Sequence, residues 1–181
     1  LWLYSLVENI LNLTRLQDGK LALSKEMEAV EEVVSSAVGH ILRRYPEREI
    51  NVSVPNELLM IPMDAKLIEQ VLINLLENAV KHTLPDQEIS VLVTEDKQNN
   101  CVVFTVADRG EGIDPVDLPN IFKMFYTSSF KHADSRHGIG LGLSICDAII
   151  KAHGGSIEAH NRTDGQGAVF IFKLPMEMNQ N

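Results

Sequence analysis

The sequence predicts a two-layer α/β sandwich in which a mixed sheet packs on about three helices. Apolar residues recur at helical spacing in long segments and alternate with polar residues in short ones. Helices and strands mix without the regular alternation of a doubly wound sheet, and 181 residues suit one compact domain. The predicted helices are residues 29–44, 64–82 and 141–152, and the predicted strands are residues 50–54, 89–94, 101–106, 156–160 and 168–174.

Local signals delimit these elements. Proline stops a helix or strand, a short acidic residue caps a helix start, and polar or glycine-rich turns join paired strands. The turn at 98–100 joins the strands on either side of it into a hairpin. In chain order the signals are Pro46, Pro55, the N-cap Asp64, Gln98-Asn99-Asn100, Gly154-Gly155 and Gly165-Gln166-Gly167.

Residues 1–16 form a further predicted helix with one apolar face, and Gly19 supplies a stop. That face needs a partner, and both packing onto its own domain and pairing with a second copy would supply one. The chain starts within this pattern and without Met, so we expect a piece of something longer. The apolar positions are Leu3, Leu6, Val7, Ile10, Leu13 and Leu16.

Composition excludes several classes of function. Hydrophobic residues make up 45% of the chain, which is enough for a sizeable core, and the formal net charge is −9. An acidic balance argues against a nucleic-acid or anionic-membrane surface. Cys101 and Cys146 lie in apolar stretches without metal-ligand spacing, so we expect buried, reduced thiols. No apolar run approaches the length of a membrane span.

The helix 64–82 carries polar residues on one edge of an otherwise apolar surface. Asn74 and Asn78 are four residues apart and share a face, and Lys81 continues the same stripe. Buried amides must be paired, so two Asn residues bonding a neighbouring loop are one reading. The other reading gives an amide oxygen to Mg²⁺ and the lysine to a phosphate. Taken alone, the pattern does not decide between them.

Asp108 follows a predicted strand and precedes the spaced glycines Gly110 and Gly112. A carboxylate there can accept a hydrogen bond from the exocyclic amine of adenine, laid against bare backbone. Guanine would present a carbonyl oxygen instead, at a cost of roughly 1–3 kcal/mol. As an isolated motif this pattern is weak, and a plain turn is the better explanation of it.

Two further segments lie between residues 108 and 143. Residues 121–126 are rich in aromatics, which predicts a core cluster, a lid that packs over nucleotide, or both. Residues 137–143 place alternate glycines before a helix, where backbone N–H groups can approach phosphates. The spacing differs from the dinucleotide-binding pattern and lacks the lysine-serine ending of a P-loop, and a flexible hinge is the competing reading.

Taken together and in this order, these segments resemble the histidine-kinase branch of the gyrase/Hsp90/MutL-type ATPases. Four boxes in order at sensible spacing carry the resemblance, which covers about residues 28–175. The matching residues are Asn74, Asn78, Lys81 and His82 in the N box, Asp108, Gly110 and Gly112 in the first glycine box, Phe122 and Phe125 in the F box, Gly138, Gly140 and Gly142 in the second glycine box, and the Gly165-Gln166-Gly167 turn. Neighbouring candidate contacts are Ile113, Tyr126, Ile139, Leu141 and Leu143.

The resemblance implies a Bergerat-type sandwich with a flexible lid, and ATP with Mg²⁺ as ligands. It implies Asn78 as the Mg²⁺ ligand, Asp108 on adenine and Lys81 near the phosphates, with Asn74 and Lys81 as the catalytic candidates. Such a site needs few reactive groups, because phosphoryl transfer depends mostly on positioning and charge neutralisation. We expect residues 1–27 to be the end of the second dimerisation helix with a linker, residues 28–176 the ATP-binding domain, and residues 177–181 a disordered tail.

The resemblance also implies partners. The γ-phosphate passes to a histidine on an upstream helix of a homodimer, and then to an aspartate of a response regulator. The expected setting is the cytoplasmic portion of a membrane-anchored bacterial sensor, without membrane contact by this segment. The run from Val71 to Lys81 is similar to potassium-responsive members. None of the six histidines has the His-Glu/Asp-x-x-x-x-Pro setting of an acceptor, so we expect the acceptor upstream of Leu1.

Three other functions compete. A gyrase-like or Hsp90-like ATPase uses a glutamate base four residues before the Mg²⁺ asparagine, but Asn74 occupies that position and cannot accept the proton. We therefore expect very slow hydrolysis. A serine kinase of the anti-sigma type is disfavoured by the dimerisation-helix pattern at residues 1–16. A non-enzymatic nucleotide sensor is disfavoured because every expected box is present.

Overall fold

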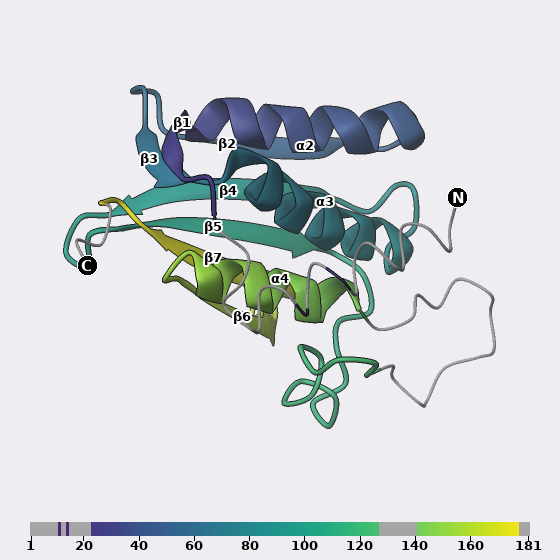
Figure 1. The fold of residues 1–181 in the computed structure, drawn as a ribbon. Helices are drawn as coiled ribbons and strands as arrows, with labels where there is room; N and C mark the ends of the chain where they lie inside the picture. Colours follow the sequence, from purple (N-terminus) through teal and green to yellow (C-terminus); the bar gives the residue numbers. More distant parts are fainter. Residues whose placement is uncertain (1–10, 12–13, 15–22, 127–140, 178–181) are drawn as a thin grey trace.

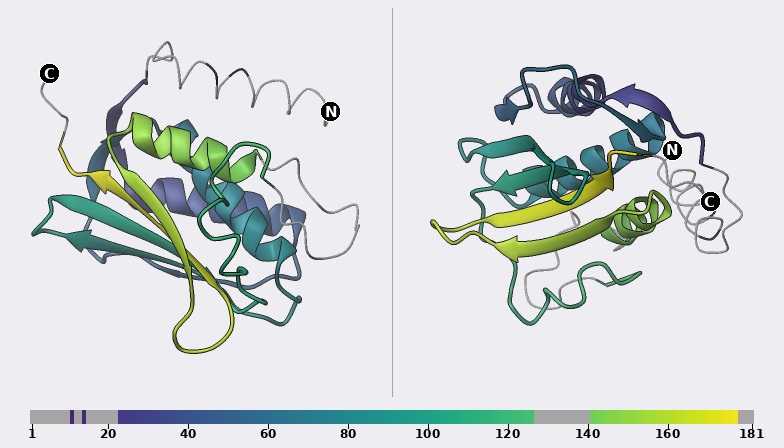
Figure 2. Two further views of the ribbon diagram at one scale, coloured as in Figure 1. Left: turned by 90° about the horizontal axis from the view of Figure 1, so that it is seen from below. Right: turned by 90° about the vertical axis from the view of Figure 1, so that its left-hand side faces the viewer.

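A computed structural model describes residues 11, 14, 23–126 and 141–177 of the chain. Within them, three helices cover one face of a five-stranded sheet, as Figures 1 and 2 show. The predicted α/β sandwich is therefore confirmed. The helices are α2 (Val30–Arg44), α3 (Ala65–Lys81) and α4 (Gly142–Ala152). The strands of the large sheet are β2 (Ile50–Ser53), β4 (Ile89–Asp96), β5 (Cys101–Asp108), β6 (Ser156–Asn161) and β7 (Ala168–Pro175).

The sheet is mixed, as predicted. Its strand order is β2-β4-β5-β7-β6, with β2 parallel to β4 and every other pair antiparallel. The β4–β5 hairpin turns at Asn100, which has a positive φ of 50°. Both strands are two residues longer than the alternation predicts, so Asp108 is the last residue of β5 and pairs with Ile89. That register places Asp108 at the end of the sheet opposite the hairpin turn.

Helix α3 is the centre of the core because it contacts α2 on one side and α4 on the other. Asp64 caps its first turn, accepting a hydrogen bond from the Leu67 N–H at 3.3 Å. Beneath the helices, Phe104 of β5 and Phe172 of β7 stack with ring centroids 4.5 Å apart, and both are fully buried. Burial of each such ring contributes about 1.5–3 kcal/mol, so the apolar faces of these elements hold the sandwich together.

A second, two-stranded sheet was missed by the sequence patterns. Strand β1 (Glu26–Ala29) pairs antiparallel with β3 (Met60–Met63) beside the helices. Each strand has only four residues, and β3 contains Pro62, which normally counts against a strand. The proline is tolerated because β3 pairs along one edge only.

Several predictions fall outside the described residues. Of the predicted opening helix, only Leu11 and Thr14 are described, and both are helical. Residues 127–140, which follow the predicted lid segment 121–126 and contain the start of the second glycine box, are not described, nor is the tail from residue 178. No helix in the described ranges is long and apolar enough to cross a bilayer. Both cysteines are buried and free, as predicted.

His153 joins the end of α4 to the start of α3. Its Nδ1 lies 2.7 Å from the Ile149 carbonyl oxygen, and its Nε2 accepts a hydrogen bond from the Asp64 N–H at 3.1 Å. These two bonds require a neutral ring that donates through Nδ1. Burial lowers the pKa of His153, and nearby Lys25 lowers it further, against the opposing effects of the Ile149 carbonyl and the Asp64 carboxylate. The ring is 2% exposed, so its protonation is coupled to unfolding.

We expect this histidine to make the fold acid-sensitive. Because the pKa is lower in the folded chain, the unfolded chain binds more protons as pH falls through the ordinary histidine pKa, and stability declines. Urea unfolding at pH 7 and pH 5 should show a loss of stability on acidification that is smaller in His153→Gln. The exposed His40→Gln variant should keep the wild-type pH dependence. A pH dependence unaltered by His153→Gln would contradict the assignment.

Candidate functional site

The polar edge of α3 lies where the sequence patterns place it. The Asn78 side chain is half-buried, and in the described part of the chain it has no hydrogen-bond partner. Lys81, one turn later, is exposed and forms no ion pair with any described residue. An unpaired amide oxygen beside an unpaired ammonium is the set of groups expected for a metal-bound phosphate. The residues present therefore fit Mg²⁺ with a phosphate ligand.

Asn74 has a different environment. Its Nδ2 donates to the Gly142 carbonyl oxygen at 3.4 Å, at the start of α4, and the Cys146 thiol of the same helix donates to the Val71 carbonyl oxygen of α3 at 3.8 Å. Burial raises the pKa of Cys146 to about 12, so this thiol is neutral. Of the two readings of the asparagine pair, bonding to a neighbouring segment applies to Asn74. Its catalytic role stays a prediction.

Asp108 is a buried carboxylate held by main-chain donors. It is 3% exposed, and its Oδ1 accepts hydrogen bonds from Gly110 N at 2.9 Å and Ala168 N at 3.2 Å. Both bonds go to the same oxygen, and no described residue donates to Oδ2. A fixed carboxylate with an oxygen left to accept is the arrangement that recognises an exocyclic amine.

The backbone around Asp108 is packed without room for side chains. A Cβ on Gly110 would lie 2.1 Å from the His82 carbonyl oxygen, so the end of the N box abuts the first glycine box. Gly112 has a φ of +82°, which favours glycine. In the last glycine turn, a Cβ on Gly167 would lie 2.0 Å from the Asp108 carbonyl oxygen. Three of the predicted boxes therefore meet at one point.

An ionic cluster holds this last turn. Asp164 accepts from Arg162 at 2.9 Å and from Arg109 at 3.1 Å, and Arg109 lies 3.7 Å from Glu88. Hydrogen bonds from Arg162 and then Arg109 keep the pKa of Asp164 well below its usual range. The carboxylate is exposed, so water screens the cluster and its contribution to stability is small. Its effect is to orient the turn toward the end of β5.

Asn161, the last residue of β6, contacts the loop after β5, and no sequence pattern predicts this contact. Its Oδ1 accepts from Ile113 N and its Nδ2 donates to Ile113 O, both at 2.7 Å. Ile113 itself packs partly against the core, directly after the first glycine box. No local spacing links residues 48 positions apart, so only the sheet register could have revealed this pair.

The two F-box phenylalanines and the neighbouring Tyr126 lie in three different environments. Phe122 packs edge-on against Phe170 at a centroid distance of 6.3 Å, which confirms the core-cluster reading for this residue. Phe125 is 57% exposed with a φ of 60°. The Tyr126 hydroxyl donates to buried Asp117, and this bond raises the pKa of Tyr126. The described part of this segment, residues 109–126, extends beyond the end of β5 as turns (Figure 1).

The second glycine box is described only from Leu141 onward, because Gly138, Ile139 and Gly140 lie outside the described residues. Leu141 is buried and precedes α4, while Leu143 packs partly against the core. Gly142 is exposed, and a Cβ there would meet no atom of the described residues within 4 Å. That the N–H groups of this first turn bind phosphate stays a prediction.

Arg48 is a second residue that sequence patterns did not single out. It is 5% exposed and donates to three carbonyl oxygens at the end of α3, namely those of Val80 at 3.1 Å, Thr83 at 3.3 Å and Leu84. It also bonds the Thr83 hydroxyl. A cation at a helix C-terminus is stabilising, because it is attracted to the partial negative charge at that end of the helix dipole. Arg48 thereby fixes the segment that carries Lys81 and His82.

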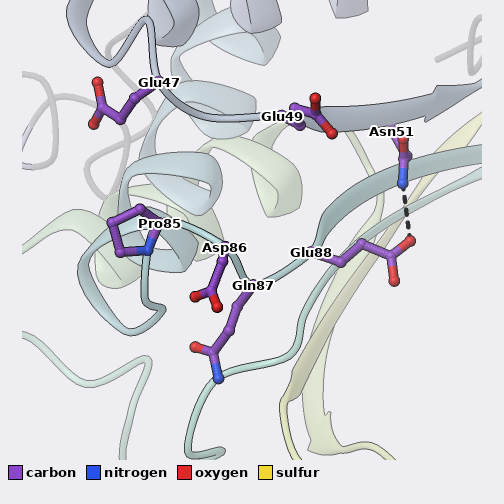
Figure 3. A pocket seen from close by; sticks show the side chains of 7 residues that line it. All are labelled: Glu47, Glu49, Asn51, Pro85, Asp86, Gln87 and Glu88. Carbon is purple, nitrogen blue, oxygen red and sulfur yellow. Dashed lines mark hydrogen bonds between the residues drawn. The ribbon is translucent and has the colours of Figure 1, made fainter.

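A hollow of about 430 Å³ lies between the β2 and β4 ends (Figure 3). Asn51 bonds Glu88 at its rim at 3.0 Å. Four carboxylates line it, and they would repel phosphate, so this hollow is not the nucleotide site. The lining residues are Glu47, Glu49, Asn51, Pro85, Asp86, Gln87 and Glu88.

Together these features form an α/β sandwich with a candidate nucleotide site at the end of α3. Residues 63–178 match the family described as histidine kinase-, DNA gyrase B-, and HSP90-like ATPases. The chain belongs to this family, which confirms the resemblance inferred from the boxes.

Similar relatives include bacterial sensor proteins. The chain is 47% identical over 98% of its length to the sensor protein KdpD of Clostridium acetobutylicum, and 41% identical over 95% to KdpD of Escherichia coli. It spans 19% of each relative. A crystal structure of full-length ShkA with AMPPNP superposes with a TM-score of 0.81 at 29% identity, over 99% of this chain and 37% of that one.

We expect Gly110→Ala to destabilise the domain by roughly 1–3 kcal/mol, because the new methyl group collides with the His82 carbonyl and the backbone must shift. Gly142→Ala is the matched control. It adds the same atoms in open space within a helix, where alanine exceeds glycine by about 1 kcal/mol in propensity. Urea unfolding of both variants measures the difference. Equal stability of Gly110→Ala and wild type would disprove the close packing.

Proposed function

We propose that this domain binds Mg-ATP and supplies the γ-phosphoryl group to a histidine of a two-component sensor kinase. The buried Asp108 carboxylate, fixed by two main-chain donors at the end of β5, is the observation that carries the proposal. The family match and the sensor-protein relatives support it. The similarity of the segment from Val71 to Lys81 to potassium-responsive members extends the proposal to a potassium-linked stimulus.

Each described residue has a role that its environment permits. Asp108 accepts a hydrogen bond from the adenine amine, while Gly110 and Gly112, which lack side chains, let the base approach the backbone. The unpaired Asn78 amide would hold Mg²⁺, which neutralises phosphate charge when bound. Lys81 would neutralise the remaining charge. Transfer breaks the bond between the γ-phosphorus and the β–γ bridging oxygen and forms a phosphorus–nitrogen bond on the acceptor imidazole, with ADP as the leaving group.

The remaining nucleotide contacts are proposals of the same kind. His82, Ile113, Phe122, Phe125 and Tyr126 would border the nucleotide from the ends of α3 and β5. Gly138, Ile139, Gly140, Leu141, Gly142 and Leu143 would surround the phosphates. Asn74, bonded to Gly142, would keep α3 and α4 in register beneath them.

The wider assembly follows from the same proposal. Residues 1–27 would continue a dimerisation helix that carries the acceptor, and residues 28–176 would be the catalytic domain, followed by a short tail. The full protein would be a membrane-anchored homodimer with this domain in the cytoplasm, and a response-regulator aspartate would receive the phosphate. Hydrolysis is disfavoured, because Asn74 is an amide that already donates to Gly142.

Calorimetric titration with AMPPNP and Mg²⁺ tests the adenine assignment. We expect the wild type to bind and Asp108→Asn to bind roughly ten- to a hundredfold more weakly, because an amide donor can then face the adenine amine. Asp96→Asn makes the same change at the opposite end of β4 and should bind like the wild type. Failure of the folded wild type to bind would overturn the proposal.

Transfer requires a separate acceptor. With γ-labelled ATP, we expect the purified chain to leave its own six histidines unlabelled and to label an added helical hairpin that carries a His-Glu/Asp-x-x-x-x-Pro motif. The label should be acid-labile, as phosphohistidine is, and should disappear when the acceptor histidine becomes glutamine. Acid-stable label would indicate a serine kinase instead. Binding without transfer would indicate a nucleotide sensor.

A further inference from the structure

The Asn161 side chain forms both hydrogen bonds that a neighbouring strand would offer to one residue. Its carboxamide accepts from the N–H of Ile113 and donates to the carbonyl of the same residue, each at 2.7 Å. In an antiparallel sheet, two paired residues exchange the same two bonds. Ile113 lies in a loop and is not itself part of a strand, so the Asn161 side chain supplies the two bonds that a paired backbone would otherwise make.

The contact acts on the loop that follows Asp108. Gly112, with its φ of +82°, directly precedes Ile113, and a Cβ on Gly112 would lie 2.9 Å from Asn161 Oδ1. The loop between Gly110 and Ile113 is therefore fixed at both ends. Asp108 holds the Gly110 N–H, and Asn161 holds the main chain of Ile113.

Both contacts share one rigid frame. Asn161 pairs with Ala168 across β6 and β7, and the Ala168 N–H donates to Asp108 Oδ1 at 3.2 Å. A single residue of β7 therefore sets the distance between the carboxylate and the residue that holds the loop. The sheet fixes the backbone of Asn161, and the two hydrogen bonds from its side chain fix the position of the Ile113 main chain relative to the sheet.

We propose that Asn161 is a positioning residue that pre-forms the adenine-facing loop of residues 110–113 before nucleotide arrives. This inference rests on the proposed nucleotide binding. Ordering a free loop costs conformational entropy at the moment of binding, and a loop held in advance avoids that cost. The loop faces the base, so Asn161 affects the affinity of every adenine nucleotide equally, whatever its number of phosphates.

Asn161→Asp is the sharpest test because it replaces one NH₂ group by an oxygen and leaves the shape unchanged. The Ile113 carbonyl would then face an anionic oxygen in place of a donor. We expect the affinities for ADP and for AMPPNP to fall by the same factor, roughly ten- to a hundredfold. A loss confined to AMPPNP would place the effect at the phosphates and overturn the inference.

The pH dependence separates positioning from general damage. A protonated carboxyl group regains a donor, so the ratio of variant to wild-type affinity should rise as pH falls from 8 to 5. The charged groups nearest this loop, namely Asp108, Arg109 and Arg162, and the nucleotide itself are the same in both measurements, so the ratio cancels their effects. Asn161→Ala has no carboxyl group and should show a weakened affinity with a ratio that does not change with pH.

Asn99→Asp is the matched control, since it makes the same change at the β4–β5 turn, beside Asp96. Circular dichroism checks that each variant is folded. If a variant at position 161 is not folded, Asn161→Ser, which keeps a short polar group, is measured in its place. Wild-type affinity in folded Asn161→Asp would overturn this inference alone. Absence of binding by folded wild type would instead overturn the proposed function on which it rests.

Discussion

The buried Asp108 carboxylate is the constraint on which the rest of the site depends. A charge that is 3% exposed must be satisfied by fixed donors, and those donors are the N–H groups of Gly110 and Ala168. One belongs to the loop after β5 and the other to the first residue of β7. The carboxylate thus brings the glycine loop and the last strands to one point. Gly167 packs against the Asp108 carbonyl oxygen so closely that a side chain at this position would push the last glycine turn away from β5.

Helix α3 both packs in the core and carries polar candidate site residues, and both features are visible in its sequence. Its buried face is continuous with the core, while its opposite edge carries Asn78 and Lys81, whose side chains have no partner among the described residues. Arg48 and His153 hold the two ends of the helix, the first at its carbonyl end and the second beside its N-cap Asp64. A helix fixed at both ends and buried along one face presents its remaining edge with little freedom, which suits a site that works by positioning groups.

The larger part of the fold was predictable because it depends on local periodicity. Long helical patterns and the turns that separate alternating strands are properties of neighbouring residues. The four-residue strands β1 and β3 were not predictable, since Pro62 and their short length hide any alternation. Asp108 was found from its place between a strand and spaced glycines. Asn161 was not, because its significance lies in a sheet register that joins it to Ile113, 48 residues away.

The pairing of Asp108 with Ala168 has a consequence for the nascent protein. The two residues are 60 positions apart, and β7 lies between β5 and β6 in the sheet. During synthesis the N box and the first glycine box leave the ribosome early, but the carboxylate gains its second donor only when β7 has emerged and inserted. A chain that has not yet reached β7 therefore holds the recognition motifs without the geometry that joins them, and it becomes able to bind ligand only after β7 has been made.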